Sequence, residues 1–326
     1  MITQVRLAFR LQRFEILAVA IMVVVLVISA VLVRNRLDAA VVTPECWLVW
    51  FGQGPFGSAA CEAPVQAFLA INEEEAGKVM AAMALLPLAV GLFLGVPLVA
   101  REIEAGTAPT VWFLAGSRSR WLLGRMVPVV VILLLLLGGL TIATEFLWSG
   151  REPWSPALRF GDAGLHGPVI VAKGLAAFGL ALLVGAVLGR LLPAVIIGAA
   201  LCLVLYLGAE MAINIWLRDE SLRHAVVVDP QKSGGDQSNF PGGTYFSQQW
   251  QSPDGTLLEQ EEALQRVPAG VTDPYAWLYD NLKTVMTGVP GTAYPEWSRM
   301  ETTGFALIGV GALLLAFPVV SRRRPQ

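Results

Sequence analysis

The chain has 326 residues, of which 55% are hydrophobic and only 15% are charged, and its mean hydropathy is +0.62. Soluble domains carry about 25% charged residues, so this composition places the chain among membrane proteins. The net charge of −2 comes without a basic run, which argues against a nucleic-acid surface. Two histidines and three cysteines are too few for most metal sites.

Six apolar stretches are long enough to cross a bilayer, whose hydrocarbon core of about 30 Å requires roughly 20 helical residues. They lie at approximately 15–33, 80–100, 126–148, 168–189, 193–216 and 303–320. We therefore expect an all-α membrane protein with six transmembrane helices. The apolar core of the first stretch, 16–33, is longer than that of a typical signal peptide, which favours an uncleaved anchor.

The positions of lysine and arginine predict how these helices are oriented. If the N-terminus is cytoplasmic, the inner segments carry roughly twice as many lysines and arginines as the short outer segments. This excess on the inner side predicts an N-in/C-in arrangement. The long segment between the fifth and sixth helices then lies outside the cell.

Two outer regions are sizeable under this topology. The first, 34–79, contains Cys46 and Cys61, and a bridge across about 15 residues would contribute roughly 3 kcal/mol on that oxidising face. We expect this disulfide, although two unrelated thiols are the alternative. The second, 217–302, is rich in Gly, Pro, Gln and Ser but also carries Trp and Tyr. It predicts a partly packed extracytoplasmic cap, with a substrate lid as the alternative.

Three ionisable residues fall in the outer thirds of the third, fourth and fifth spans. They are Glu145, Lys173 and Glu210. Charges inside a membrane span are costly and are functional candidates by default. Their similar depth predicts an ion-paired cluster with Lys173 between two carboxylates. The alternative is that each side chain extends to the outer interface.

Sequence motifs of several enzyme classes are absent. The chain has no G-x-x-x-x-G-K-[ST] phosphate-binding loop, no H-E-x-x-H zinc motif and no G-x-S-x-G nucleophile elbow. We therefore expect no catalytic residues and no metal site in this chain.

The segment 101–125 interrupts the apolar stretches with charge. Arg101, Glu102 and Glu104 continue the second helix past the bilayer, and the pair Gly106–Thr107 then provides a break and a polar capping group. Trp112 suits the membrane interface, whereas Arg118 and Arg120 suit the cytosol or lipid headgroups. A hinge followed by a short surface helix suits docking to a cytosolic protein. An ordinary positive-inside loop would explain the arginines but not the two glutamates.

These residues also carry a family resemblance. The run PLVAREIEAGT at 97–107, followed by Trp112 and SRSRW at 117–121, resembles the permease subunits of ABC-2 type transporters, especially those of actinobacteria. GAVLGRLLPA at 185–194 is similar to the turn between the family's fourth and fifth spans. WSRMETTG at 297–304 is similar to the start of its sixth span, which makes Glu301 the matching acid. The outer loop at 230–295 departs from the pattern.

The resemblance implies the membrane-spanning permease subunit of an ATP-driven exporter in the cell membrane. Two copies, or one copy and a related chain, would form the transmembrane unit, and separate ATPase subunits would bind ATP and Mg²⁺ below it. This chain itself would bind no cofactor. The residues implied in coupling to the ATPase are Arg101, Glu102, Glu104, Gly106, Thr107, Trp112, Arg118 and Arg120. Charge reversal at Glu102 and Glu104 is then expected to uncouple transport while membrane insertion stays intact.

The expected organisation follows from these features. The resemblance implies an interfacial helix over 1–14. Helices one to five are expected over 15–216, the cap over 217–302, and the sixth helix with its basic tail over 303–326. Two other functions remain open. One is a membrane scaffold or sensor whose outer cap binds a protein, and the other is an intramembrane enzyme. Co-purification with a P-loop ATPase would distinguish the transporter from both.

Overall fold

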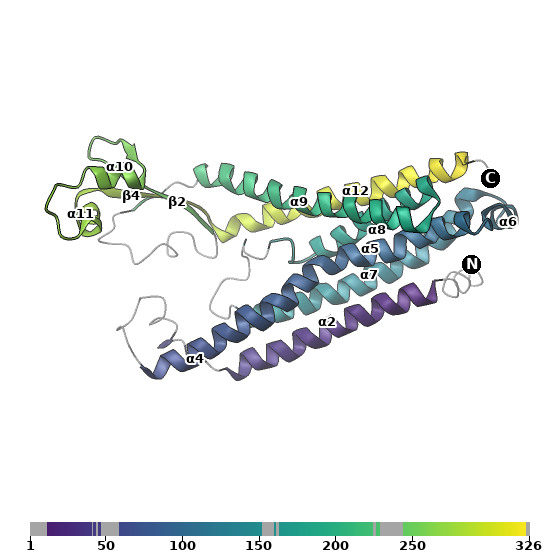
Figure 1. Cartoon of the computed structure of the whole chain (residues 1–326), viewed down its shortest axis with the longest axis horizontal. Coiled ribbons are helices and arrows are strands. Elements are labelled where there is room, and N and C mark those ends of the chain that lie inside the picture. The colour runs from purple at the N-terminus through teal and green to yellow at the C-terminus, as the bar shows by residue number, and fades with distance from the viewer. Residues whose placement is uncertain are drawn as a thin grey trace. The chain divides into compact units, whose positions relative to one another are not determined.

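The computed structural model describes residues 12–40, 42–43, 45–46, 59–151, 160, 163–223, 226–228 and 244–323 (Figure 1). Most of the interfacial helix predicted for 1–14 therefore lies outside the described residues. The described chain is mostly helical, and six of its helices are long and apolar enough to cross a membrane. This confirms the expected helical membrane fold with six spanning segments, although the described residues also include the short strands given below.

The elements continue past the predicted spans, because a helix does not end where the hydrocarbon core ends. The helices are α2 (Arg13–Ala39), α4 (Ala59–Ala70), the π-helix η1 (Ile71–Ala76), α5 (Gly77–Glu104), α6 (Ala108–Leu114), α7 (Arg118–Arg151), α8 (Val169–Leu188), α9 (Leu191–Arg223), α10 (Gln260–Gln265), α11 (Pro274–Asn281), the 3₁₀-helix η3 (Gly291–Ala293) and α12 (Tyr294–Arg322). The strands are β1 (Val226–Val228), β2 (Thr244–Gln251), β3 (Leu257–Leu258) and β4 (Lys283–Val289).

The chain forms two compact units. The first consists of Met1–Pro153, Gly164–Gly208 and Ser298–Gln326. The second consists of Trp154–Ala163 and Ala209–Trp297. The membrane-spanning stretches belong mainly to the first unit, while α9 and α12 pass from one unit into the other.

The first unit is built around α8. Among the six long helices α8 is the most enclosed, with 78% of its apolar window buried against 22% for α2. The backbones of α5 and α8 touch, because a Cβ atom added at Gly91 would lie 2.5 Å from the backbone nitrogen of Phe178. On another side of α8, a Cβ atom added at Gly179 would lie 2.4 Å from the carbonyl oxygen of Gly309 in α12. Glycine allows both approaches.

The segment before α5 is helical rather than an irregular loop. Helices α4, η1 and α5 run on without a break, and 45 residues, Ala60–Glu104, form one continuous rod. At 1.5 Å per residue its length is about 68 Å, more than twice the roughly 30 Å of a bilayer core. In Figure 1 the rod lies beside α2 and α7, on which it packs. Much of the predicted outer region 34–79 is therefore a helical extension.

The second unit contains the four-stranded antiparallel sheet β1-β4-β2-β3. Strand β4 is central, and it pairs with β2 from Thr244↔Val289 to Gln251↔Lys283. The β-branched residues of β4 suit a pleated, buried position. One hydrophobic cluster of this unit comprises Trp250, Leu258, Ala263, Leu278 and Leu282, and another comprises Phe160, Ile213, Leu217, Val289, Tyr294 and Trp297. The sequence predicted a partly packed cap here but did not identify the sheet.

Candidate functional site

The end of α5 turns sharply into α6. Gly106 adopts a φ of 68°, a left-handed conformation that favours glycine after a helix end. The next residue closes the turn, since the backbone N–H of Thr107 donates to the carbonyl of Glu102 at 3.1 Å. The hydroxyl of Thr107 also donates to Oε2 of Glu102 at 2.5 Å. The Gly-Thr pair thus fixes the direction in which α6 leaves α5.

Glu102 is engaged inside the protein rather than presented to a partner. Its Oε1 accepts a hydrogen bond from Nη1 of Arg125 at 2.8 Å, and both side chains are only 13% exposed. The guanidinium of Arg125 also lies over the ring of Trp121, 5.0 Å from its centroid. The pair therefore fastens the end of α5 to the first turns of α7.

The neighbouring charges make two further ties. Nη1 of Arg101 lies 3.2 Å from Oε1 of Glu15, which joins α5 to the start of α2. The carboxylate of Glu104 accepts from the backbone N–H of Leu191 at 2.8 Å, and so caps the first turn of α9. Three charges within four residues thus connect α5 to three different helices. This role accounts for the two glutamates that an ordinary positive-inside loop did not explain.

Helix α6 has a buried base and an exposed edge. Trp112 packs edge-to-face on Trp121 with ring centroids 6.1 Å apart, and the guanidinium of Arg118 lies 4.7 Å from the Trp112 ring centroid. The next two side chains turn away, and Phe113 is 86% and Leu114 79% exposed. Successive helical residues point about 100° apart, so one residue can anchor a short helix while its neighbours face outward. Neither Phe113 nor Leu114 was predicted as a site residue from the sequence, although WFL stands out there as an apolar triplet.

The two arginines predicted near α6 have different surroundings. Arg118 donates to backbone carbonyls at the end of α12. Arg120 is exposed, and its backbone N–H donates to the hydroxyl of Ser117. In the contacts described for these two arginines, the side chain of Arg118 bonds to another element, whereas that of Arg120 does not.

The predicted intramembrane cluster needs correction. Nζ of Lys173 lies 3.0 Å from Oε1 of Glu301, with the two side chains 5% and 6% exposed, and it also donates to the carbonyl of Gly164 at 3.1 Å. The carboxylate partner of Lys173 is thus Glu301 rather than Glu145. Depth along the sequence gives the height of a residue in a helix, but not the direction in which its side chain points.

The contacts described for the other two members of that cluster are with other residues. Oε1 of Glu145 accepts from the backbone N–H of Gly167 at 2.8 Å and lies 3.3 Å from Nδ1 of His166. His166 is buried and meets Trp148 edge-to-face. Glu210 belongs to the second unit, where its carbonyl accepts from Nδ2 of Asn214 at 2.8 Å. Among the residues that the structure describes, no group of three or more His, Cys, Asp or Glu could hold a metal ion.

A comparison with protein families identifies the class of protein. A family model described as "ABC-2 membrane transporter related" matches residues 16–218, more than half of the chain. The chain belongs to this family. It is therefore a multi-pass protein of the cell membrane and a membrane component of a transporter. No curated protein and no solved structure matches it.

The matched range covers the first five membrane-spanning helices. It includes the segment 101–125 with its three ties and α6, and it ends before β1. Members of the ABC-2 family act as membrane transport components and are generally not catalytic themselves. They associate in general with ABC ATPase partners.

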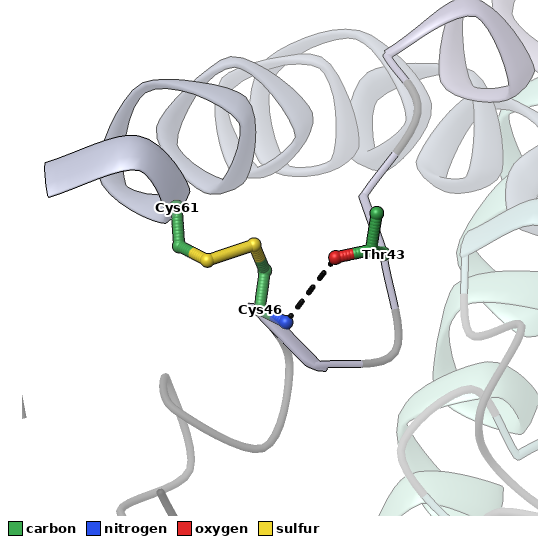
Figure 2. Close-up of a disulfide and its surroundings, with 3 residues drawn as sticks. All are labelled: Thr43, Cys46 and Cys61. Atoms are coloured by element: carbon green, nitrogen blue, oxygen red, sulfur yellow. Dashed lines mark hydrogen bonds between the residues drawn. A yellow bond between two sulfur atoms is a disulfide. The ribbon is translucent and has the colours of Figure 1, made fainter. Parts of the chain in front are cut away.

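The ABC-2 chain also carries one disulfide. Figure 2 shows the bond between Cys46 and Cys61, whose Cα atoms are 5.1 Å apart, and the hydrogen bond that the backbone N–H of Cys46 donates to the hydroxyl of Thr43. This is the pair for which we expected a bridge. It ties the segment that follows α2 to the first turn of α4. The remaining thiol, Cys202, is buried in α9.

Proposed function

We propose that this ABC-2 chain is the permease subunit of an ATP-driven exporter, and that separate ATPase subunits dock on α6 and the adjoining segment 101–125. The observation that carries the proposal is the exposure of Phe113 and Leu114 on a helix whose base is fixed by Trp112 and Arg118. Exposed apolar side chains on a rigid support are typical of a surface that another protein covers. The proposal of export, rather than import, rests on the family resemblance.

The proposed docking surface requires that this end of the first unit face the cytoplasm. The end of α5, the start of α7, the turn between α8 and α9 and the end of α12 meet there through the contacts of Glu104, Arg118 and Arg323. Exposed Arg190 and Arg322 add positive charge to the same elements. Positive charge in short flanks favours the cytoplasmic side.

Cysteine labelling tests this orientation. Thr110→Cys on α6 and Asp254→Cys on the β2–β3 turn both replace exposed residues. In intact cells that express the chain without its ATPase, a membrane-impermeant maleimide is expected to label position 254 but not position 110, and to label both after permeabilisation. Labelling of position 110 in intact cells would contradict the proposal.

The docking surface differs from the one that charge alone suggested. Glu102 and Glu104 each hold another helix, so reversing their charges would disturb the fold as well as the coupling. A segment can transmit an ATPase's state only if it contacts the ATPase differently in two states. In our proposal, Phe113 and Leu114 make those contacts and the glutamates hold α6 in place. ATP and Mg²⁺ would be held by the ATPase, and a second copy or a related chain would complete the transmembrane unit.

Recruitment of the ATPase tests the docking surface directly. Burying an apolar side chain contributes about 1.5–3 kcal/mol, so Phe113→Ser combined with Leu114→Ser should reduce capture of the ATPase by more than about tenfold. Leu192→Ser is the matched control, because Leu192 is 70% exposed near the start of α9 but lies outside the proposed surface. Capture is measured by affinity purification of the tagged chain after co-expression with a P-loop ATPase chosen as its candidate partner. Equal capture by the double variant would refute the assignment.

A further inference from the structure

The carboxyl end of α12 is held by Arg118, the first residue of α7 and four positions beyond the end of α6. Nη1 of Arg118 donates to the carbonyl of Ser321 at 2.7 Å and also to the carbonyl of Arg323. The last carbonyls of a helix have no partner within the helix, and arginine can satisfy two of them at once. The first residue of α7 is thereby joined to a residue about 200 positions later in the chain.

Arg323 continues this connection to α8. Its guanidinium donates to the carbonyls of Ala186 and Val187, the second at 3.1 Å, near the end of α8. Gly189, with a φ of 64°, leaves space for the Arg323 guanidinium. A Cβ atom at this position would lie 2.2 Å from Nη2 of Arg323. Arg323 is thus held through its own carbonyl by Arg118 and holds α8 through its side chain. We call Arg118 and Arg323 the clasp.

Beyond the clasp, α8 and α12 are joined along their length. Their backbones touch at Gly179 and Gly309, and farther out Lys173 is paired with Glu301. The 20 or so residues between Glu301 and the clasp span about 30 Å, the thickness of the bilayer core. Separating a buried ion pair costs several kcal/mol, so α8 and α12 should move as one body.

We propose that the clasp transmits movement of α6 to α12 and α8, so that ATP-driven displacement at the docking surface reaches the outer boundary of the membrane. This inference rests on the proposed function, because it requires an ATPase on α6. Arg118 and Arg323 act as positioning residues that touch neither nucleotide nor substrate. The physical basis is the continuous series of contacts from Trp112 through Arg118 and Arg323 to the paired helices.

A purely structural role would give a different result. If the two arginines only cap helix ends, removing them lowers stability but leaves the response to ATP unchanged in the folded complex. Arg322 provides the matched control, since it carries the same charge one position away and is exposed. Among the contacts described, its side chain forms no hydrogen bond or ion pair.

Hydrogen exchange in the assembled complex tests the proposal. The full chain is reconstituted in nanodiscs with its ATPase, and backbone exchange of α8 and α12 is compared with and without ATP, Mg²⁺ and vanadate. Wild type and Arg322→Ala are expected to show the same nucleotide-dependent change. In Arg323→Ala this change should fall at least about threefold while the ATPase is still recruited, because the coupling would be lost. Arg118→Ala should show the same fall in the fraction of the complex that holds its ATPase.

Two results would overturn the proposed role of the clasp. One is a wild-type response in both Arg118→Ala and Arg323→Ala, and another is the absence of any response of α8 and α12 in a wild-type complex that holds its ATPase. If the alanine variants do not fold, Arg118→Lys and Arg323→Lys replace them, since lysine keeps the charge but lacks the planar fork. Failure of the proposed function is distinguishable, because the wild-type chain would then recruit no ATPase.

Discussion

The two ends of the first unit use charge in different ways. At the α6 end, Arg101, Glu102 and Glu104 tie α5 to three helices, and the Glu102–Arg125 pair keeps 13% of each side chain exposed. At the opposite end, Lys173 and Glu301 are 5% and 6% exposed. Water can take over the contacts of a partly exposed pair when it opens, but not those of a buried pair. The first arrangement suits a joint that moves, and the second suits a joint that stays closed.

The largest expected effect comes from opening the buried joint. Lys173→Met removes the ammonium that faces the buried carboxylate of Glu301 and should lower the free energy of unfolding by about 3–5 kcal/mol. The double variant Lys173→Met with Glu301→Leu should recover most of that loss, because it removes both charges. Unfolding in mixed detergent micelles measures both variants. A single variant as stable as wild type would remove the distinction between the two joints.

Loss of the disulfide should have the next largest effect on the free energy of unfolding. Cys61→Ser removes the bond to Cys46 across a separation of 15 residues, for which the chain-entropy model gives a loss of about 3 kcal/mol. The double variant with Cys46→Ser should lose no more than the single one, since both lack the same bond. Unfolding with and without reducing agent provides the measurement. Equal stability of the oxidised and reduced wild-type chain would show that the bond does not stabilise this segment.

A smaller effect is expected at the α6 end. Glu102→Gln keeps the shape of the side chain but removes the charge that faces Arg125, and should lower the free energy of unfolding by about 1–2 kcal/mol. Because the pair is partly exposed, this difference should shrink as salt concentration rises. A loss as large as that of Lys173→Met, and independent of salt, would place both joints in the same class.

The smallest effect is expected where an ion pair is short but exposed. Nη1 of Arg36 lies 2.7 Å from Oε1 of Glu75, yet the side chains are 64% and 37% exposed. Arg36→Ala should therefore change the free energy of unfolding by only about 0.5 kcal/mol. A loss above about 2 kcal/mol would show that distance, rather than burial, ranks these pairs.

Hydropathy predicted the spanning helices because bilayer thickness acts directly on the sequence: a run such as VVVILLLLLGGL can satisfy its backbone in lipid only as a helix. The partners of the charges could not be predicted in the same way. Glu301 lies just outside the predicted span 303–320, and its rotation about α12 decides that it meets Lys173. The direction in which a helix points each side chain depends on how the helices pack, and this packing involves residues far apart in sequence.

The candidate site was predicted in outline but not in its roles. Gly106 and Thr107 were expected to form a break, and the structure shows the turn and its hydrogen bonds. The glutamates were interpreted as contacts for a partner because their own partners, Arg125 and the N–H of Leu191, come from other helices. Phe113 and Leu114 were overlooked because exposed apolar residues in a hydrophobic chain resemble membrane residues until the fold is known.

The rod formed by α4, η1 and α5 amplifies small rotations. With a length of about 68 Å, a tilt of about 5° around Glu104 would swing the far tip sideways by roughly 6 Å. The disulfide between Cys46 and Cys61 joins the segment that follows α2 to this tip, so the segment and the tip would move together. A rocking movement too slight to open a path through the bilayer would thus become a displacement of several ångströms at the end of the rod opposite Glu104.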